Sequence, residues 1–119
     1  MYELLLWLDI IPGRNWLILG PGAAELAGLV REGSQPTGVT VAEDALSFET
    51  STFDVAIVLA APVTRALVDE LRRIVWPAGT VAAQVSAKPG VIESIFEAAS
   101  LHAVQSCALG GLTAVRGTR

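Results

Sequence analysis

Residues 15–25 read NWLILGPGAAE, and this stretch decides the fold of the chain. Its apolar run, Trp16 to Leu19, predicts a short buried strand, and Gly20-Pro21-Gly22 predicts a tight turn. The residues that follow carry apolar side chains at the spacing of one helix face, which predicts a helix over 23–31. A strand, a glycine turn and a helix in this order bind nucleotide phosphates in many open α/β sheets. The stretch therefore predicts the frame of a nucleotide-binding unit.

The rest of the chain continues the alternation of helices and apolar strands. Residues 53–60 read FDVAIVLA, an almost wholly apolar run that is typical of a strand covered on both faces. Gly110-Gly111 separates two strand-like runs and predicts a hairpin. We expect strands over 16–19, 37–41, 53–60, 80–86, 103–109 and 112–116, and helices over 2–11, 23–31, 62–76 and from 89 onward. Pro77-Ala78-Gly79 is expected to be the turn between the helix and the strand on either side of it. This order predicts a three-layer α/β domain with a mostly parallel sheet and an antiparallel hairpin at its C-terminal edge.

Composition limits the possible partners and compartments. At 119 residues the chain is the size of one domain, and its 52% hydrophobic content excludes general disorder. The net charge of −4 argues against binding to nucleic acid, because phosphate contacts need clustered Lys and Arg. A single cysteine, Cys107, and a single histidine, His102, leave no internal disulfide and little for a metal site. No run approaches the ~20 apolar residues that span a bilayer, and we expect residues 4–8 not to be a signal peptide, so we expect a cytoplasmic protein.

The order of elements resembles the class I methyltransferase fold, the Rossmann-like sheet that binds S-adenosylmethionine. LLLWLDIIPGRNWLILGPGAAELAGLV (4–30) is similar to that family's entry helix, first strand and glycine loop. STFDVAIVLA (51–60) resembles its fourth strand, and LVDELRRIVWPAGTVAAQV (67–85) resembles the helix and fifth strand that follow. The hairpin at Gly110-Gly111 fits the antiparallel last strands. The resemblance implies one methyltransferase-like domain over 1–119, with an entry helix and turn over 1–14.

Departures from the family's glycine loop weaken the expected cofactor site. The loop of the family usually reads D/E-x-G-x-G-x-G, whereas Ile18 stands here at the acid and Ala24 at the third glycine. If residues 37–41 are the second strand, Thr40 occupies the place of the acid that binds the ribose hydroxyls. The loop after the fourth strand, Ala60-Ala61-Pro62, has no Asn or Asp to orient an amine. These replacements imply a degenerate form of the family.

The short interval between the helix over 23–31 and the strand over 53–60 implies that one βα unit is shortened or missing. Two alignments are open. Residues 37–41 can be the second strand, or VAEDALSF (41–48) can match the segment before the fourth strand, where an acid touches the adenine. In the second alignment it is the second strand that is missing.

Four residues are the candidates for cofactor binding: Gly20, Gly22, Glu43 and Asp44. The glycines allow close approach of a ligand to the backbone, but a strand-to-helix turn needs them for its geometry as well. Glu43 and Asp44 could hold a ribose or an adenine amine, but their position in a polar connection favours solvated loop acids. No catalytic residue and no metal ligand is expected.

The N-terminal segment is the candidate for a partner contact. Residues 4–11 are apolar on nearly all sides, whereas a surface helix buries one stripe. We expect Leu5, Trp7 and Leu8 to contact a protein partner or a second copy of the chain.

Three functions are compatible with the sequence. The first is a non-catalytic methyltransferase-like domain that serves as a protein-binding or structural module, with no cofactor. The second is an active small-molecule methyltransferase that uses S-adenosylmethionine in a reduced site. The third is a nicotinamide-nucleotide module, which ranks last because Glu25 replaces the final glycine of G-x-G-x-x-G/A.

Overall fold

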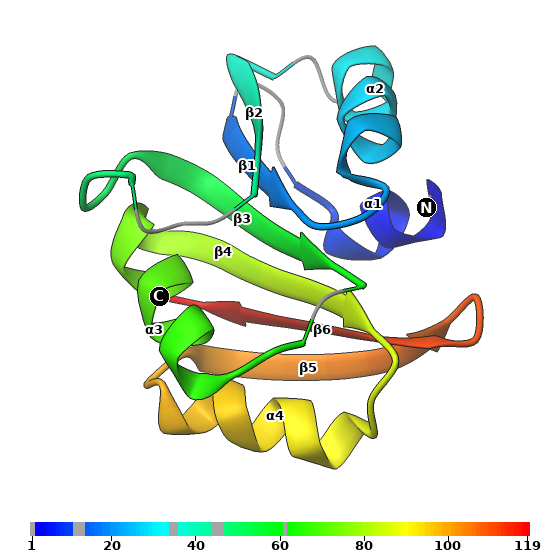
Figure 1. The fold of residues 1–119 in the computed structure, drawn as a ribbon, viewed down its shortest axis with the longest axis vertical. Coiled ribbons are helices and arrows are strands. Elements are labelled where there is room, and N and C mark those ends of the chain that lie inside the picture. The colour runs from blue at the N-terminus through cyan, green and yellow to red at the C-terminus, as the bar shows by residue number, and fades with distance from the viewer. Residues whose placement is uncertain (1, 11–13, 34–35, 44–46, 61) are drawn as a thin grey trace.

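The structure is a computed structural model and describes residues 2–10, 14–33, 36–43, 47–60 and 62–119. In these residues one six-stranded sheet separates two pairs of helices, as Figure 1 shows. The elements in chain order are α1 (Tyr2–Leu8), β1 (Asn15–Leu19), α2 (Ala23–Gly33), β2 (Gly38–Ala42), β3 (Phe53–Leu59), α3 (Arg65–Ile74), β4 (Val75–Val85), α4 (Pro89–Ala98), β5 (His102–Leu109) and β6 (Leu112–Thr118).

The strand order of the sheet is β2-β1-β3-β4-β6-β5. Strands β2, β1, β3 and β4 are parallel, and β6 runs antiparallel to both β4 and β5. The prediction of a mostly parallel sheet with a C-terminal antiparallel hairpin is therefore confirmed. The last strand of the chain, β6, lies between β4 and β5, and β5 forms the edge of the sheet.

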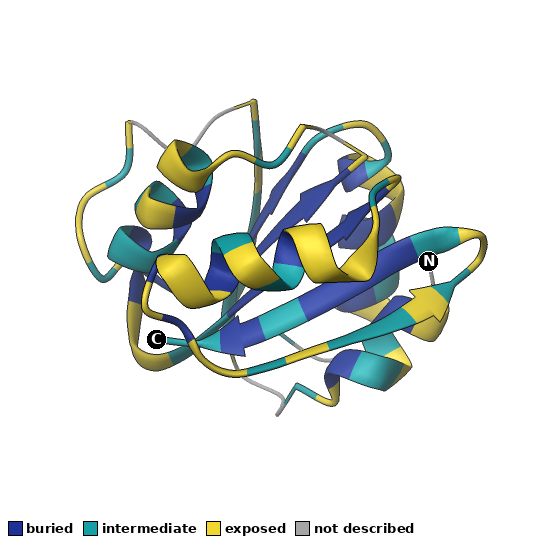
Figure 2. Cartoon of the chain, turned by 90° about the horizontal axis from the view of Figure 1, so that it is seen from below, coloured by how far each residue is buried: buried dark blue, intermediate teal, exposed yellow. Residues whose placement is uncertain are grey.

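Alternation of side chains along the central strands builds two cores. Leu17, Ala56 and Val81 belong to the cluster that packs under α3 and α4. Their neighbours Ile18 and Val55 belong to the cluster that packs under α1 and α2. Successive side chains of a strand point to opposite faces, so a continuous apolar run supplies both cores at once. Figure 2 shows the central strands buried and the outward face of α4 exposed.

The connection from β2 to β3 replaces a βα unit. Strand β2 pairs with β1, so the second strand is present and the missing unit lies after it. The described part of this connection, residues 47–52, forms no helix, and there the ring of Phe48 lies edge-on to Phe53 with centroids 5.1 Å apart. Arg73 of α3 fixes this loop, because its Nη2 donates to the Phe48 carbonyl at 2.8 Å.

Strand β4 begins earlier than predicted. The helix expected over 62–76 ends at Ile74, and Val75 and Trp76 already belong to β4 together with the expected turn at 77–79. Val75 pairs with Phe53 of β3, which starts the strand. Further along, Ala78 N–H donates to the Arg119 carbonyl at 3.2 Å, and Arg119 N–H donates to the Gly79 carbonyl at 3.0 Å. Strand β4 therefore pairs through a segment whose sequence resembles a turn.

Arg116 of β6 attaches the short helix α1 to the sheet. Its Nη1 donates to the carbonyls of Trp7 and Leu8 at 2.5 and 3.3 Å, and its Nη2 donates to Gln105 Oε1 at 2.7 Å. The guanidinium also lies over the Trp7 ring, 4.7 Å from its centroid. A cation here satisfies carbonyls at a helix C-terminus and favours their partial negative charge. Arg116 thus fixes the orientation of α1.

Replacing Arg116 should loosen α1 and destabilise the domain. We expect Arg116→Ala to lower the free energy of unfolding by about 1–3 kcal/mol, because charge-assisted hydrogen bonds to partly buried carbonyls are lost. Urea denaturation followed by circular dichroism measures this change. Arg65→Ala is the matched control, since Arg65 makes only an exposed ion pair with Asp69 on α3, and we expect its effect to stay within about 0.5 kcal/mol. Equal effects of the two substitutions would contradict the role given to Arg116.

Candidate functional site

Two of the predicted cofactor residues lie side by side at the carboxyl ends of the parallel strands. Leu19, the last residue of β1, pairs with Ala42, the last residue of β2. Gly20 and Glu43 come directly after these two residues. In open α/β sheets, ligands bind at this end of the strands. The structure therefore brings Gly20 and Glu43 to neighbouring strand ends.

Gly20 has a structural reason to be glycine. Its φ is +97°, and a Cβ added there would lie 2.0 Å from the Leu59 carbonyl oxygen at the end of β3. Its carbonyl accepts the N–H of Ala23 at 3.1 Å, and the Gly22 carbonyl accepts the N–H of Leu26 at 3.1 Å. Gly22 also has a positive φ, +84°. The two glycines thus make the turn into α2 whether or not a ligand is bound.

The second strand, β2, ends one residue later than the sequence analysis expected. Thr40 pairs with Leu17 inside β2, two residues before the strand ends, so it is not the residue at the strand end. The residue that directly follows the strand is Glu43, whose side chain is exposed. Thr40 therefore lies within the strand, which extends to Ala42. Asp44 lies outside the described residues.

The inner wall beneath the glycine loop is apolar. Ile18, at the position of the family's acid, has no exposed surface and packs in the same cluster as Leu26 and Ile57. A carboxylate there would have to be desolvated, and an unpaired buried charge is costly. Position 18 therefore serves the core in this chain.

An open groove of ≈ 520 Å³ lies at the carboxyl ends of β3 and β4, and it is larger than the groove of ≈ 310 Å³ beside Arg14 and Asp54. Its walls come from the end of β3, the segment before α3, the start of α4 and the first residue of β6. Thr113 Oγ1 donates to the Ala87 carbonyl at 2.5 Å and fixes one wall. The described lining residues are Ala60, Pro62, Val63, Val85, Ser86, Ala87, Val91, Ile92 and Leu112. Among them only Ser86 has a polar side chain, so this groove offers contact to apolar groups and no general acid or base.

The predicted partner-binding residues are divided between the core and the surface. Leu8 is buried, with 4% of its surface exposed, and packs in the cluster under α1 and α2. Leu5 and Trp7 are half-buried at the edge of that cluster. Leu6, which the sequence analysis did not single out, is 63% exposed. Helical periodicity alone could have placed Leu4 and Leu8 on the buried stripe and Leu6 opposite to it.

A depression of ≈ 220 Å³ adjoins Leu6 between α1 and α2. Leu5, Leu6, Ile10 and Leu29 supply its apolar lining, and Asp9 lies among the residues at its border. We call Leu5, Leu6, Trp7 and this depression the α1 surface. It combines apolar side chains with the polar border at Asp9, and it is large enough to take a side chain from another molecule.

The thiol of Cys107 is not activated as a nucleophile. Burial raises the pKa of the Cys107 thiol, and nearby Arg116 opposes this shift. A raised pKa keeps the sulfur protonated at neutral pH, whereas a nucleophilic cysteine needs a lowered pKa. No group of three or more His, Cys, Asp or Glu side chains within the described residues could hold a metal ion. No helix in the part of the chain that the structure describes could cross a bilayer.

Solved structures identify the fold. A chain in the complex between the Haloferax volcanii Trm112 methyltransferase activator and a proposed methyltransferase superposes with a TM-score of 0.84 at 13% identity, over 98% of this chain and 87% of that one. An Aquifex aeolicus S-adenosylmethionine-dependent methyltransferase gives 0.80 at 13% identity, over 98% and 88%. This chain has a class I methyltransferase-like fold. A Pyrococcus furiosus methyltransferase gives 0.75 at 16% identity, over 98% and 80%.

Sequence comparison does not extend this result. A scan against protein-family models finds no match, and neither does a search among curated proteins. The likeness to the solved methyltransferases therefore concerns the fold of the chain.

Gly20→Ala tests whether the glycine loop is held by packing alone. We expect a loss of roughly 3 kcal/mol or more in unfolding free energy without any ligand, because the added Cβ meets backbone and a positive φ is strained. Thermal and urea denaturation measure this change. Gly110→Ala is the control for φ strain alone, since it has φ +57° and open space at its Cβ, and should cost about 1 kcal/mol. A Gly20→Ala variant as stable as the unaltered chain would contradict the close contact with Leu59.

Proposed function

We propose that this methyltransferase-like domain binds a protein partner and does not transfer methyl groups. The observation that carries the proposal is the apolar groove at the carboxyl ends of β3 and β4. Methyl transfer requires the sulfonium methyl group and a nucleophile to be held in line at this end of the sheet. Ser86 alone among the described lining residues could orient a nucleophile, and Ser86 itself is exposed.

The glycine loop supports the same proposal. Ile18 removes the polar group beneath the loop, and Gly20 is explained by its contact with Leu59. Binding of a polar cofactor depends on paired polar groups, and each hydrogen bond that is not replaced costs about 1–3 kcal/mol. A ligand as polar as S-adenosylmethionine would therefore bind weakly here.

The α1 surface is the proposed contact with the partner. Leu6 is 63% exposed beside the depression, and Arg116 holds α1 in place before any partner arrives. A surface that is already ordered loses less entropy on binding than a mobile one. The methyltransferase fold is also compatible with such a role, since the Haloferax volcanii structure is a complex with an activator protein.

An active methyltransferase with a reduced site is the second candidate, and Glu43 favours it. Its carboxylate directly follows β2 and neighbours Gly20, which is where the family's ribose-binding acid is expected. The resemblance gives Glu43 this role only if the cofactor also tolerates Ile18 and Ala24. The first candidate function predicts weak binding of S-adenosylmethionine, and the second predicts tight binding that involves Glu43.

Titration calorimetry with S-adenosylmethionine and with its demethylated product separates the two candidates. We expect dissociation constants weaker than about 100 μM for both ligands and no change in Glu43→Gln, because the loop lacks its polar partners. Glu49→Gln is the matched control, an exposed acid in the loop before β3. A dissociation constant in the low micromolar range that Glu43→Gln weakens and Glu49→Gln does not would establish the second candidate instead.

Leu6→Glu tests the α1 surface. We expect the unaltered chain to associate with a partner or with itself in sedimentation and affinity capture, with α1 amides protected from hydrogen exchange in the complex. Leu6→Glu should abolish association and leave stability within about 0.5 kcal/mol, because the side chain is exposed. Val91→Glu is the matched control on α4, where Val91 is 54% exposed. A chain that stays monomeric and captures nothing, or one that associates through Val91 and not Leu6, would overturn the proposed surface.

A further inference from the structure

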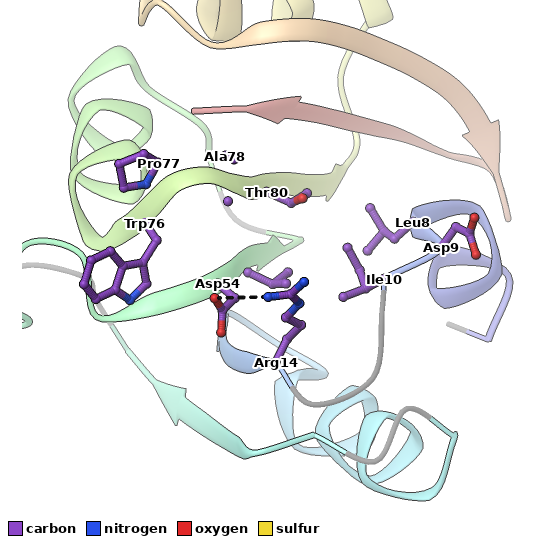
Figure 3. Close-up of a pocket in the computed structure, with 11 residues that line it drawn as sticks. Leu8, Asp9, Ile10, Arg14, Asp54, Trp76, Pro77, Ala78 and Thr80 are labelled. Carbon is purple, nitrogen blue, oxygen red and sulfur yellow. Dashed lines mark ion pairs between the residues drawn. The ribbon is translucent and has the colours of Figure 1, made fainter.

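The groove of ≈ 310 Å³ is partly polar and lies at the opposite end of the sheet from the glycine loop. The lining of this cavity includes Leu8, Ile10, Arg14, Asp54, Trp76 and Thr80. Arg14 precedes β1, Asp54 is the second residue of β3, and Thr80 lies in the amino-terminal half of β4. Figure 3 shows Arg14 in the middle of this cavity, with Asp54 on one side and Ile10 and Leu8 on the other. The cavity is thus separate from the carboxyl-end groove, and it adjoins the α1 surface, with which it shares Asp9 and Ile10.

An irregularity of the sheet shapes one wall of the cavity. Phe53 pairs with Val75, but Val55 pairs with Thr80, so β4 carries extra residues between these two points. Ala78 within this bulge has φ +70°, and a Cβ at Gly79 would lie 2.7 Å from the Trp76 carbonyl oxygen. The bulge leaves Trp76 53% exposed at the rim. Bulges and left-handed non-glycine residues are enriched beside functional sites, where the surrounding structure maintains their strain.

The charges of the cavity leave Arg14 able to bind an anion. Arg14 Nη1 is 4.0 Å from Asp54 Oδ1, which is an ion pair but is longer than a hydrogen bond. Asp54 Oδ2 already accepts the N–H of Asn15 at 2.8 Å. The guanidinium has five donors and recognises a carboxylate through two parallel hydrogen bonds. Among the described lining residues Arg14 is the one cation, and Asp9, the other acid, lies beyond Leu8 and Ile10 as seen from Arg14 in Figure 3.

We propose that this cavity binds a small carboxylate that carries a flat apolar body. The carboxylate pairs with the edge of the Arg14 guanidinium that faces away from Asp54, and Thr80 lines the same part of the cavity. The apolar body lies against Leu8 and Ile10 at the end of α1. A volume of ≈ 310 Å³ accommodates a ligand with one aromatic ring. This site does not depend on the function proposed above for the carboxyl end of the sheet.

Phenylacetate is the probe that tests the site, with phenylacetamide as its uncharged isostere. In a two-dimensional NMR titration of the whole chain, we expect saturable phenylacetate binding with a dissociation constant of about 0.1–1 mM. The amide of Thr80 and the indole N–H of Trp76 should shift, and Trp76→Phe assigns the indole signal. Phenylacetamide should bind at least about tenfold more weakly, since it cannot accept the charged bidentate pair.

Arg14→Gln should weaken phenylacetate binding about tenfold or more, whereas Arg65→Gln should leave it unchanged because Arg65 lies on α3 and does not line the cavity. The comparison of the two ligands uses the unaltered chain, so it decides the matter even if Arg14→Gln fails to fold. Saturable binding with equal affinity for phenylacetate and phenylacetamide overturns the proposal. So does an absence of saturable binding, or a set of shifts confined to the residues around Gly20 or Val91.

Discussion

The contact between Gly20 and the Leu59 carbonyl is the constraint on which the carboxyl end of this domain depends. With only hydrogens on its Cα, Gly20 lets the loop after β1 lie directly against the end of β3. This contact sets where α2 begins and brings the end of β2 beside the loop. In a nucleotide-binding protein the same geometry serves a ligand, and in this chain packing against Leu59 already requires a glycine at position 20. The presence of the glycines is therefore evidence for the fold and not, by itself, for a cofactor.

Residues around the glycine loop also have side chains that contribute to packing and carry no reactive group. Ile18 contributes to the core at a position where an active relative is expected to carry an acid, and the groove past β3 and β4 is lined by small and branched apolar side chains. Burial of such side chains stabilises the domain by roughly 25 cal/mol for each Å² removed from water. Glu43 is the exception, because it keeps a carboxylate at the end of β2. The turn into α2 is thus present in a chain whose buried residue beside it, Ile18, is apolar.

The sequence predicted the features that depend on local pattern. The apolar run at 53–60 marks a strand buried on both faces, and Gly110-Gly111 marks the hairpin, because both signals lie within a few neighbouring residues. The start of β4 was missed, since it depends on the pairing of Val75 with Phe53 and of residues 78–79 with Arg119, which are distant in sequence. The attachment of α1 by Arg116 was missed for the same reason, as it joins residues from opposite ends of the chain. The amino-end cavity likewise combines Arg14, Asp54 and Thr80, whose proximity depends on the topology of the sheet and on no sequence motif.

A crystal structure of the chain grown with saturating S-adenosylmethionine tests the central claim most directly, namely that this methyltransferase fold lacks a working methyl-transfer site. The account predicts that no cofactor lies between the glycine loop and Glu43, and that Gly20 keeps its contact with Leu59. A bound cofactor whose ribose hydroxyls pair with the Glu43 carboxylate, and whose methyl group points into the groove beside Ser86, would contradict it.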